Sequence, residues 1–534
     1  MALAVALLFF AATSALGQKS SPAGPAAGDP SSRSGRILLV LPFDNGSSQP
    51  SLEWIREAAA EILSSRFSSV GFSPMSREDR IYALDHLGLP EGFHPSRASS
   101  IKLAETLDAD AIIVGSFTTQ GSDIITEASI VDVPHLRMSQ PVDARGKMTD
   151  MIAVFDSLAW KLTRQLDPGF SGAEDTFVAA GASLRLDAFE QYIRGITEPD
   201  QSERLRHLTQ AVSLSPTFSP AWMALGREDY LGQKYGEAAE AFAKVGRNDP
   251  DALEAAFYRG LSLLFSGDYP KAEQAFADVA RILPLAEVLN NQGVAVSRQS
   301  HNAISLFRQA VAADPDTADY HFNLAVSLKR NGQNAEALSE LSQCLRLHPN
   351  DTEAKSLIGA WKSPAPTATA ADPGAKPDPL ERIARNFDEV AFRQAAQMLD
   401  QINETRMAQL SPRARALKLS ARAQDYLNRG LLLEAERLYL SAQSDDDTVA
   451  EAHAGLAQVR EMAGDAGAAR KEANLAIKLQ PSVEAYLVLG RLDLAAGNLT
   501  EANSEANEAL KLAPASQPAQ QLLRQILNRN GQRN

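Results

Sequence analysis

The stretch WMALGREDYLGQKYGEAAEAFAKVGRNDP, residues 222–250, decides the fold because its pattern recurs along the chain. An alanine stands twelve residues before a proline or aspartate that ends a helix, and this spacing occurs seven times. The pairs are Ala238/Pro250, Ala272/Pro284, Ala303/Pro315, Ala337/Pro349, Ala435/Asp447, Ala469/Pro481 and Ala502/Pro514. The terminating residues are 34, 31 and 34 residues apart in the first group, and 34 and 33 apart in the second. Such a period predicts stacked helix pairs, because one pair alone cannot bury its apolar face.

Each unit combines small and large residues at fixed positions. Gly226 and Ala238 are small, so two helices can approach closely there, and Phe242 fills the space beside them. The recurrence of these positions predicts two helical arrays, over residues 187–361 and 413–527.

The same positions resemble the tetratricopeptide repeat, whose pattern is a large residue, Leu-Gly, then Ala, Phe, a small residue and Pro. The resemblance covers about half of the chain. An eighth, degenerate copy is expected from Phe189 to Pro216. The resemblance implies a solenoid whose concave face binds an extended peptide or a partner segment.

A different pattern precedes the repeats, over residues 36–168. Arg36–Phe43 is a continuous apolar run and 111–114 is a second one, as expected for buried strands. Residues 123–132 alternate and predict a hairpin partner, and 148–166 predict an amphipathic helix. The expected fold class is therefore α+β multidomain: a mixed α/β domain followed by two all-α arrays.

Three short motifs in this domain carry a second resemblance: Leu-Pro-Phe-Asp-Asn (41–45), Ala-Asp-Ala-Ile-Ile-Val-Gly-Ser (109–116) and Ile-Val-Asp-Val (130–133). They are similar to the amino-terminal domain of TolB and to FlgO- and CsgG-like domains of bacterial envelopes. That resemblance implies a non-catalytic docking or assembly module.

The segments outside these domains have their own composition. Residues 1–17 are apolar, uncharged and end in small residues, which predicts a cleaved signal peptide and a periplasmic or secreted protein. An uncleaved anchor is the alternative; a lipoprotein is not expected, because no cysteine lies near the site. Residues 18–35 read as a disordered linker, 362–380 as a proline-rich linker and 381–412 as a helical connector.

Composition and motifs give little support for catalysis. The net charge of −14 argues against a general affinity for nucleic acid, and no integral membrane span is expected after signal cleavage. The chain has no phosphate-binding loop, nucleophile elbow or H-E-x-x-H spacing, so no catalytic residue, cofactor or metal is predicted. Cys344, His321 and His453 fall at packing positions of the repeat, which predicts burial.

The concave face is the remaining candidate site. By resemblance to the repeat family, its lining includes aromatic anchors and four cations, which suit a peptide carrying acidic groups or a free carboxylate. The residues in register are Arg227, Tyr230, Phe257, Leu261, Leu264, Asn290, Val294, Arg298, Phe322, Lys329 and Arg330. The alternative is that the apolar members pack in the core and the cations are solvated.

Three classes of function follow. The first is a non-enzymatic extracytoplasmic scaffold that binds protein or peptide partners, including envelope-assembly components. The second is a sensory or regulatory repeat protein that acts with a separate effector. The third is an enzyme of the α/β domain that depends on Asp44 or Ser116.

Overall fold

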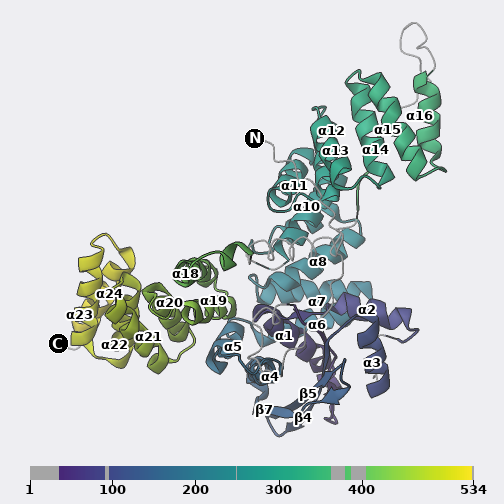
Figure 1. Ribbon diagram of the computed structural model, residues 1–534. Helices are drawn as coiled ribbons and strands as arrows, with labels where there is room; N and C mark the ends of the chain where they lie inside the picture. Colours follow the sequence, from purple (N-terminus) through teal and green to yellow (C-terminus); the bar gives the residue numbers. More distant parts are fainter. Residues whose placement is uncertain are drawn as a thin grey trace, which may run out of the picture.

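The computed structural model describes residues 35–90, 96–247, 249, 251–362, 379–385 and 405–531. The expected signal peptide (1–17) and most of the two linkers lie outside these residues. An α/β head lies at the base in Figure 1, and the two helical arrays leave it in different directions. This arrangement confirms the expected fold class.

The head contains a seven-stranded mixed sheet. The strands are β1 (Ile37–Val40), β2 (Asp44–Asn45), β3 (Ser73–Pro74), β4 (Ala111–Gln120), β5 (Asp123–Asp132), β6 (Arg137–Met138) and β7 (Val142–Lys147). β1 lies between β3 and β4 and is parallel to both, whereas β5 is antiparallel to β4, β6 and β7. The β4–β5 hairpin is the pair expected from the alternating pattern.

Both faces of the sheet are covered, which explains the continuous apolar run of β1. Leu38 and Val40 pack on the side of α1 (Ile55–Ser69) and α4 (Met151–Leu166). Leu39 and Leu41 pack on the opposite side, with helices α2 (Arg77–His86) and α3 (Arg97–Thr106).

The first array consists of stacked antiparallel helix pairs (Figure 1). Its helices are α6 (Leu186–Thr197), α7 (Gln201–Leu214), α8 (Ser219–Leu231), α9 (Tyr235–Phe242), α10 (Ala252–Ser266), α11 (Tyr269–Ile282), α12 (Ala286–Arg298), α13 (Ile304–Ala313), α14 (Ala318–Arg330), α15 (Asn334–Leu347) and α16 (Thr352–Lys362). Gly226, Gly260 and Gly293 each face a phenylalanine ring, at distances that leave no room for a Cβ atom. The expected close approach of paired helices is therefore confirmed.

The second array repeats this packing with α18 (Pro412–Asn428), α19 (Leu432–Asp445), α20 (Ala450–Met462), α21 (Ala466–Leu479), α22 (Val483–Ala496), α23 (Leu499–Leu512) and α24 (Gln517–Gly531). It packs against α5 (Glu174–Gly181), the helix that follows the head. The carboxylate of Glu436 in α19 accepts hydrogen bonds from the Ala173 amide at 3.2 Å and the Thr176 hydroxyl at 3.0 Å. Arg460 of α20 forms an ion pair with Glu436 at 2.5 Å.

One continuous hydrophobic core joins these parts. It includes Leu38 of the sheet, Ile193 of α6, Leu225 of α8 and Leu433 of α19. The head therefore shares its core with the start of both arrays.

The connector between the arrays differs from the helix expected over 381–412. Residues 379–385 have no regular secondary structure and lie across the first array, while 386–404 are outside the described residues. A short helical stretch from Thr405 and then α18 complete the connection.

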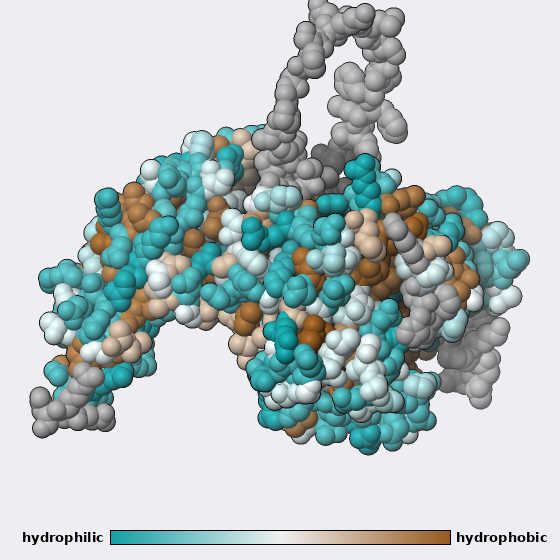
Figure 2. Space-filling model, turned by 90° about the horizontal axis from the view of Figure 1, so that it is seen from below, coloured by the Kyte–Doolittle hydropathy of each residue, from teal (hydrophilic) through white to brown (hydrophobic). Residues whose placement is uncertain are grey.

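The described surface is mostly hydrophilic on the face shown in Figure 2, with smaller hydrophobic patches between. Large exposed apolar side chains come from separate elements, such as Tyr82 in α2, Leu231 in α8 and Leu512 in α23. Among the described helices, none combines the length and apolar character needed to span a bilayer.

Candidate functional site: the groove of the first array

The concave side of the first array holds residues 379–385, with the sequence Pro-Leu-Glu-Arg-Ile-Ala-Arg. This segment contacts α14 through Arg330, α12 through Asn291 and α10 through Phe265. These are the first helices of successive pairs, which the repeat pattern predicts to line the inner surface. We refer to residues 379–385 as the groove segment.

Asparagine side chains hold the main chain of the groove segment. Oδ1 of Asn323 accepts the Arg382 amide at 2.6 Å, and its Nδ2 donates to the Arg382 carbonyl at 2.7 Å. Asn291 makes the same pair of bonds with Ala384, at 2.9 Å from the amide and 2.7 Å to the carbonyl. Residues two apart in an extended chain present their amide and carbonyl groups to the same side, so the two clamps select extended backbone.

The clamp continues through Asn290, which donates to the Arg382 carbonyl at 3.1 Å and accepts from Asn323 at 2.7 Å. All three asparagines have no exposed surface. A buried amide without hydrogen-bond partners is strongly unfavourable, and here the main chain of the groove segment supplies those partners while it shields the asparagines from water.

A basic pocket receives the side chain of Glu381. Nε of Arg298 lies 2.9 Å from the carboxylate, and both Arg330 and Ser297 donate to its other oxygen. Burial alone would raise the pKa of the Glu381 carboxyl, but the Ser297 hydrogen bond and the two arginines outweigh it and lower that pKa. Glu381 is therefore held as a buried, charged anion between two cations.

An acidic pocket receives the next side chain, Arg382. Its guanidinium lies 3.7 Å from the centre of the Phe322 ring and pairs with Asp351 at 2.6 and 3.1 Å. Asp319 at 2.8 Å and Glu353 at 3.1 Å complete the pocket. The hydrogen bonds from Arg382 lower the pKa of Asp351 to about 2.

The rest of the groove segment makes apolar and aromatic contacts. Ile383 packs against the core of α10–α14, and Ala384 packs on the cluster that includes Ala286 and Leu289. The guanidinium of Arg385 lies 5.3 Å from the centre of the Phe265 ring. A cavity of about 520 Å³ adjoins Glu381, lined by Ser297, Arg298, Ser300, His301, Asn302, Ser327, Arg330 and Asn331.

Four of the residues predicted for the groove come together on this segment. They are Asn290, Arg298, Phe322 and Arg330. Asn290 and Arg298 lie in α12, and Phe322 and Arg330 lie in α14. Arg298 and Arg330 contact Glu381, while Asn290 and Phe322 contact Arg382.

The other seven predicted groove residues have different surroundings. Arg227 pairs with Glu254 at 2.7 Å and with Glu78 of the head at 3.3 Å, so it joins the array to the head. Tyr230 lies in an aromatic cluster with Tyr235, Tyr258 and Phe265. Phe257 is fully buried against Phe276. Lys329 donates to Asn334 and lies over the ring of Trp361. Leu261, Leu264 and Val294 are core residues.

Sequence reasoning missed Asn291, Asn323 and the acidic pocket. A signal for the asparagines was present in the sequence: they interrupt the apolar runs of α12 and α14. Asparagine is a weak helix former, so its place inside these helices needs another reason. The acidic pocket had no such signal, since Asp351 lies beyond the turn that ends α15. The expectation of a groove lined by aromatic anchors and cations is therefore incomplete: the groove has a basic and an acidic pocket side by side.

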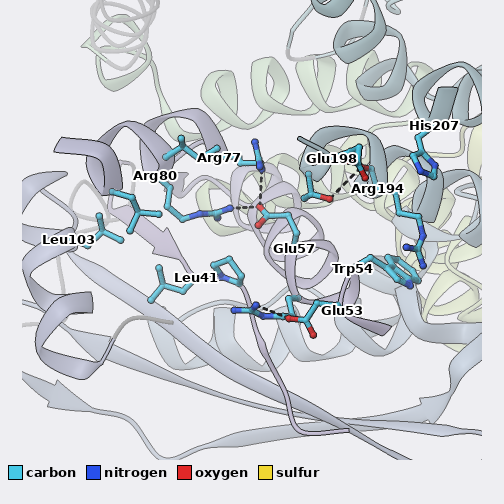
Figure 3. A pocket seen from close by; sticks show the side chains of 15 residues that line it. Leu41, Glu53, Trp54, Glu57, Arg77, Arg80, Leu103, Arg194, Glu198 and His207 are labelled. Atoms are coloured by element: carbon cyan, nitrogen blue, oxygen red, sulfur yellow. Dashed lines mark hydrogen bonds and ion pairs between the residues drawn. The ribbon is translucent and has the colours of Figure 1, made fainter. Parts of the chain in front are cut away.

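A second cavity, of about 410 Å³, lies between the head and the first array (Figure 3). Several of its charged side chains form ion pairs: Glu57 binds Arg80 and lies 3.8 Å from Arg77. Arg194 pairs with Glu190 at 2.8 Å. The first two contacts lie within the head and the third within α6, while Arg194 also donates to the Ser51 carbonyl of the head at 3.2 Å. The groove is therefore the better candidate for binding.

Two comparisons bear on the fold. Residues 223–287 and 298–360 each match a family model of the tetratricopeptide repeat. The chain contains tetratricopeptide repeats. Neither model describes an enzymatic family, and no curated protein matches the chain.

Two solved structures are among those similar to part of this chain. The crystal structure of MamA is 15% identical, with a TM-score of 0.28, and the match covers 30% of this chain and 96% of MamA. The structure of YrrB, described as a TPR protein with an unusual peptide-binding site, is 16% identical, with a TM-score of 0.29 and coverage of 38% and 99%.

Proposed function

We propose that this protein is a non-enzymatic scaffold that holds an extended segment of a partner protein in the groove of its first array. The observation that carries the proposal is the asparagine clamp, in which Asn291 and Asn323 each bind both hydrogen-bonding groups of one peptide residue. Main-chain recognition supplies affinity for extended chains, and the two charged pockets supply selectivity.

The head and residues 1–17 indicate where this scaffold acts. The head resembles docking domains of bacterial envelopes, and residues 1–17 have the composition of a signal peptide, so we place the scaffold outside the cytoplasm. Cell fractionation and the amino-terminal sequence of the mature protein test that location. A mature protein that starts at Met1 in the cytoplasmic fraction would contradict it.

Site-specific photocrosslinking tests the groove directly. His301 lies on the rim of the cavity beside Glu381, whereas Gln309 of α13 is exposed on the helix behind the groove. We expect a photoreactive residue at position 301 to capture a partner in intact cells, and the same residue at 309 to capture little. Equal capture from both positions would contradict a groove-bound partner.

A further inference from the structure

We propose that the groove segment is a built-in ligand, and that the partner which displaces it presents an extended Glu-Arg-aliphatic-small sequence. This inference rests on the proposed function and specifies the partner of the same site. The partner is thus a peptide segment in which an acidic residue directly precedes an arginine.

The order of the charges follows from the two pockets. Glu381 lies between Arg298 and Arg330, and one residue later Arg382 lies among three carboxylates. A segment with the reversed order would bring Arg near two arginines and Glu near the carboxylates. Like charges at such distances repel strongly when they are buried, so the groove discriminates against that order.

The small and aliphatic positions follow from packing. Asn291 binds the main chain of Ala384, whose partly buried side chain packs against the cluster that includes Ala286 and Leu289. Ile383 is half-buried against the α10–α14 core. A large side chain at the position of Ala384 would separate the main chain from Asn291.

Covalent attachment makes the groove segment a strong competitor. Residues 363–378 connect α16 to Pro379, so the segment is never far from the groove. Short linkers of this kind give effective concentrations on the order of millimolar. An external peptide therefore binds weakly until the groove segment leaves, or until it outcompetes that segment.

The test measures binding of a fluorescent peptide with the sequence of residues 379–385 to the full chain by anisotropy. Two variants open the groove: E381A/R382A removes both charged contacts, and A384P removes the amide that donates to Asn291 while keeping both charges. Circular dichroism checks that each variant keeps its helices. We expect both variants to bind the peptide at least ten-fold more tightly than the wild type.

A control peptide of the same composition exchanges Glu381 and Arg382, and we expect it to bind the opened variants at least ten-fold more weakly. Equal binding of the two peptides would overturn the Glu-Arg requirement. Equal binding of the parent peptide to wild type and opened variants would overturn the built-in ligand but leave the proposed function intact. If no form of the protein binds the peptide, the proposed function fails as well.

The segment of a second copy is the competing occupant, and light scattering distinguishes it. We expect the wild type to have the same mass at all concentrations. A dimer that forms with concentration and is lost in E381A/R382A would show that the segment comes from a neighbouring chain, and would overturn the proposal.

Discussion

Asn323 is a single residue on which the geometry of the groove segment depends, because it binds both the amide and the carbonyl of Arg382. Each hydrogen bond contributes about 0.5–1.5 kcal/mol, so N323A weakens docking of the segment by about 1–3 kcal/mol. We expect amide exchange of residues 381–385 to accelerate about 10- to 100-fold, measured by mass spectrometry. The exposed Asn507 of α23 provides the control, N507A, which leaves this exchange unchanged.

A second prediction at this scale concerns His453, which is buried as expected. Its Nδ1 lies 2.7 Å from the Glu472 carboxylate and its Nε2 lies 2.7 Å from the carbonyl of Asp447. Trp222 and His321 contact the carbonyl six residues earlier in the same way, so this is a recurring contact of the repeat. The hydrogen bond to Glu472 raises the pKa of His453.

The raised pKa of His453 determines how the stability of the second array changes with pH. A raised pKa means that protonated His453 stabilises the folded second array below the unfolded pKa of about 6.5, and that this stabilisation is lost as the pH rises through the folded pKa. We expect α20 and α21 to open more readily at pH 8 than at pH 6, measured by hydrogen exchange corrected for its intrinsic pH dependence. H453Q removes this difference. A difference of the same size in H453Q would contradict the assignment.

At the scale of paired helices, Gly455 controls how closely α19 and α20 approach. A Cβ atom at Gly455 would lie 2.0 Å from the ring of Tyr439, whose hydroxyl donates to Gln424 at 3.0 Å. Overpacking costs about 1–3 kcal/mol, and it exceeds the gain of up to about 1 kcal/mol in helix propensity. We therefore expect G455A to lower the free energy of unfolding by about 1–2 kcal/mol in urea denaturation.

Gly467 in α21 provides the matched substitution. A Cβ atom there meets only Asp465, at 3.5 Å, so propensity decides the result. We expect G467A to leave stability unchanged or to raise it by up to about 1 kcal/mol. Destabilisation of both variants to the same extent would show that the close approach at Gly455 is not the cause.

The helix pairs were predictable because their period repeats a local packing rule. Gly226 and Phe242 belong to one unit, so their contact follows from spacing alone. The groove segment was not predictable in this way: its sequence favours a helix, but the asparagines of α12 and α14 bind its main chain in an extended form. Tertiary contacts from residues about 60 to 90 positions away override its local preference.

At the scale of the whole molecule, the second array is fixed to the head by contacts far apart in sequence. Arg460, Glu436 and Thr176 form one buried group, and Thr176 lies 260 residues before Glu436. No local pattern in the sequence indicates this contact. Together with Leu433, which packs in the core of the head, it anchors the start of the second array, which leaves the head in a different direction from the first array in Figure 1.

Removal of Arg460 should release the second array. R460A leaves Glu436 buried without its cation, and breaking one partner of a buried ion pair costs about 3–5 kcal/mol. We expect a larger radius of gyration and a broader distance distribution in small-angle X-ray scattering.

The control is R491A, which removes the ion pair between the half-exposed Arg491 and Glu461 and costs about 0–1 kcal/mol. Because Arg460 contacts α5 and α19, whereas the groove segment contacts α10, α12 and α14, R460A should leave binding of the 379–385 peptide unchanged. A change in peptide binding together with the expansion would mean that the two arrays act as one coupled unit rather than as separately anchored arms.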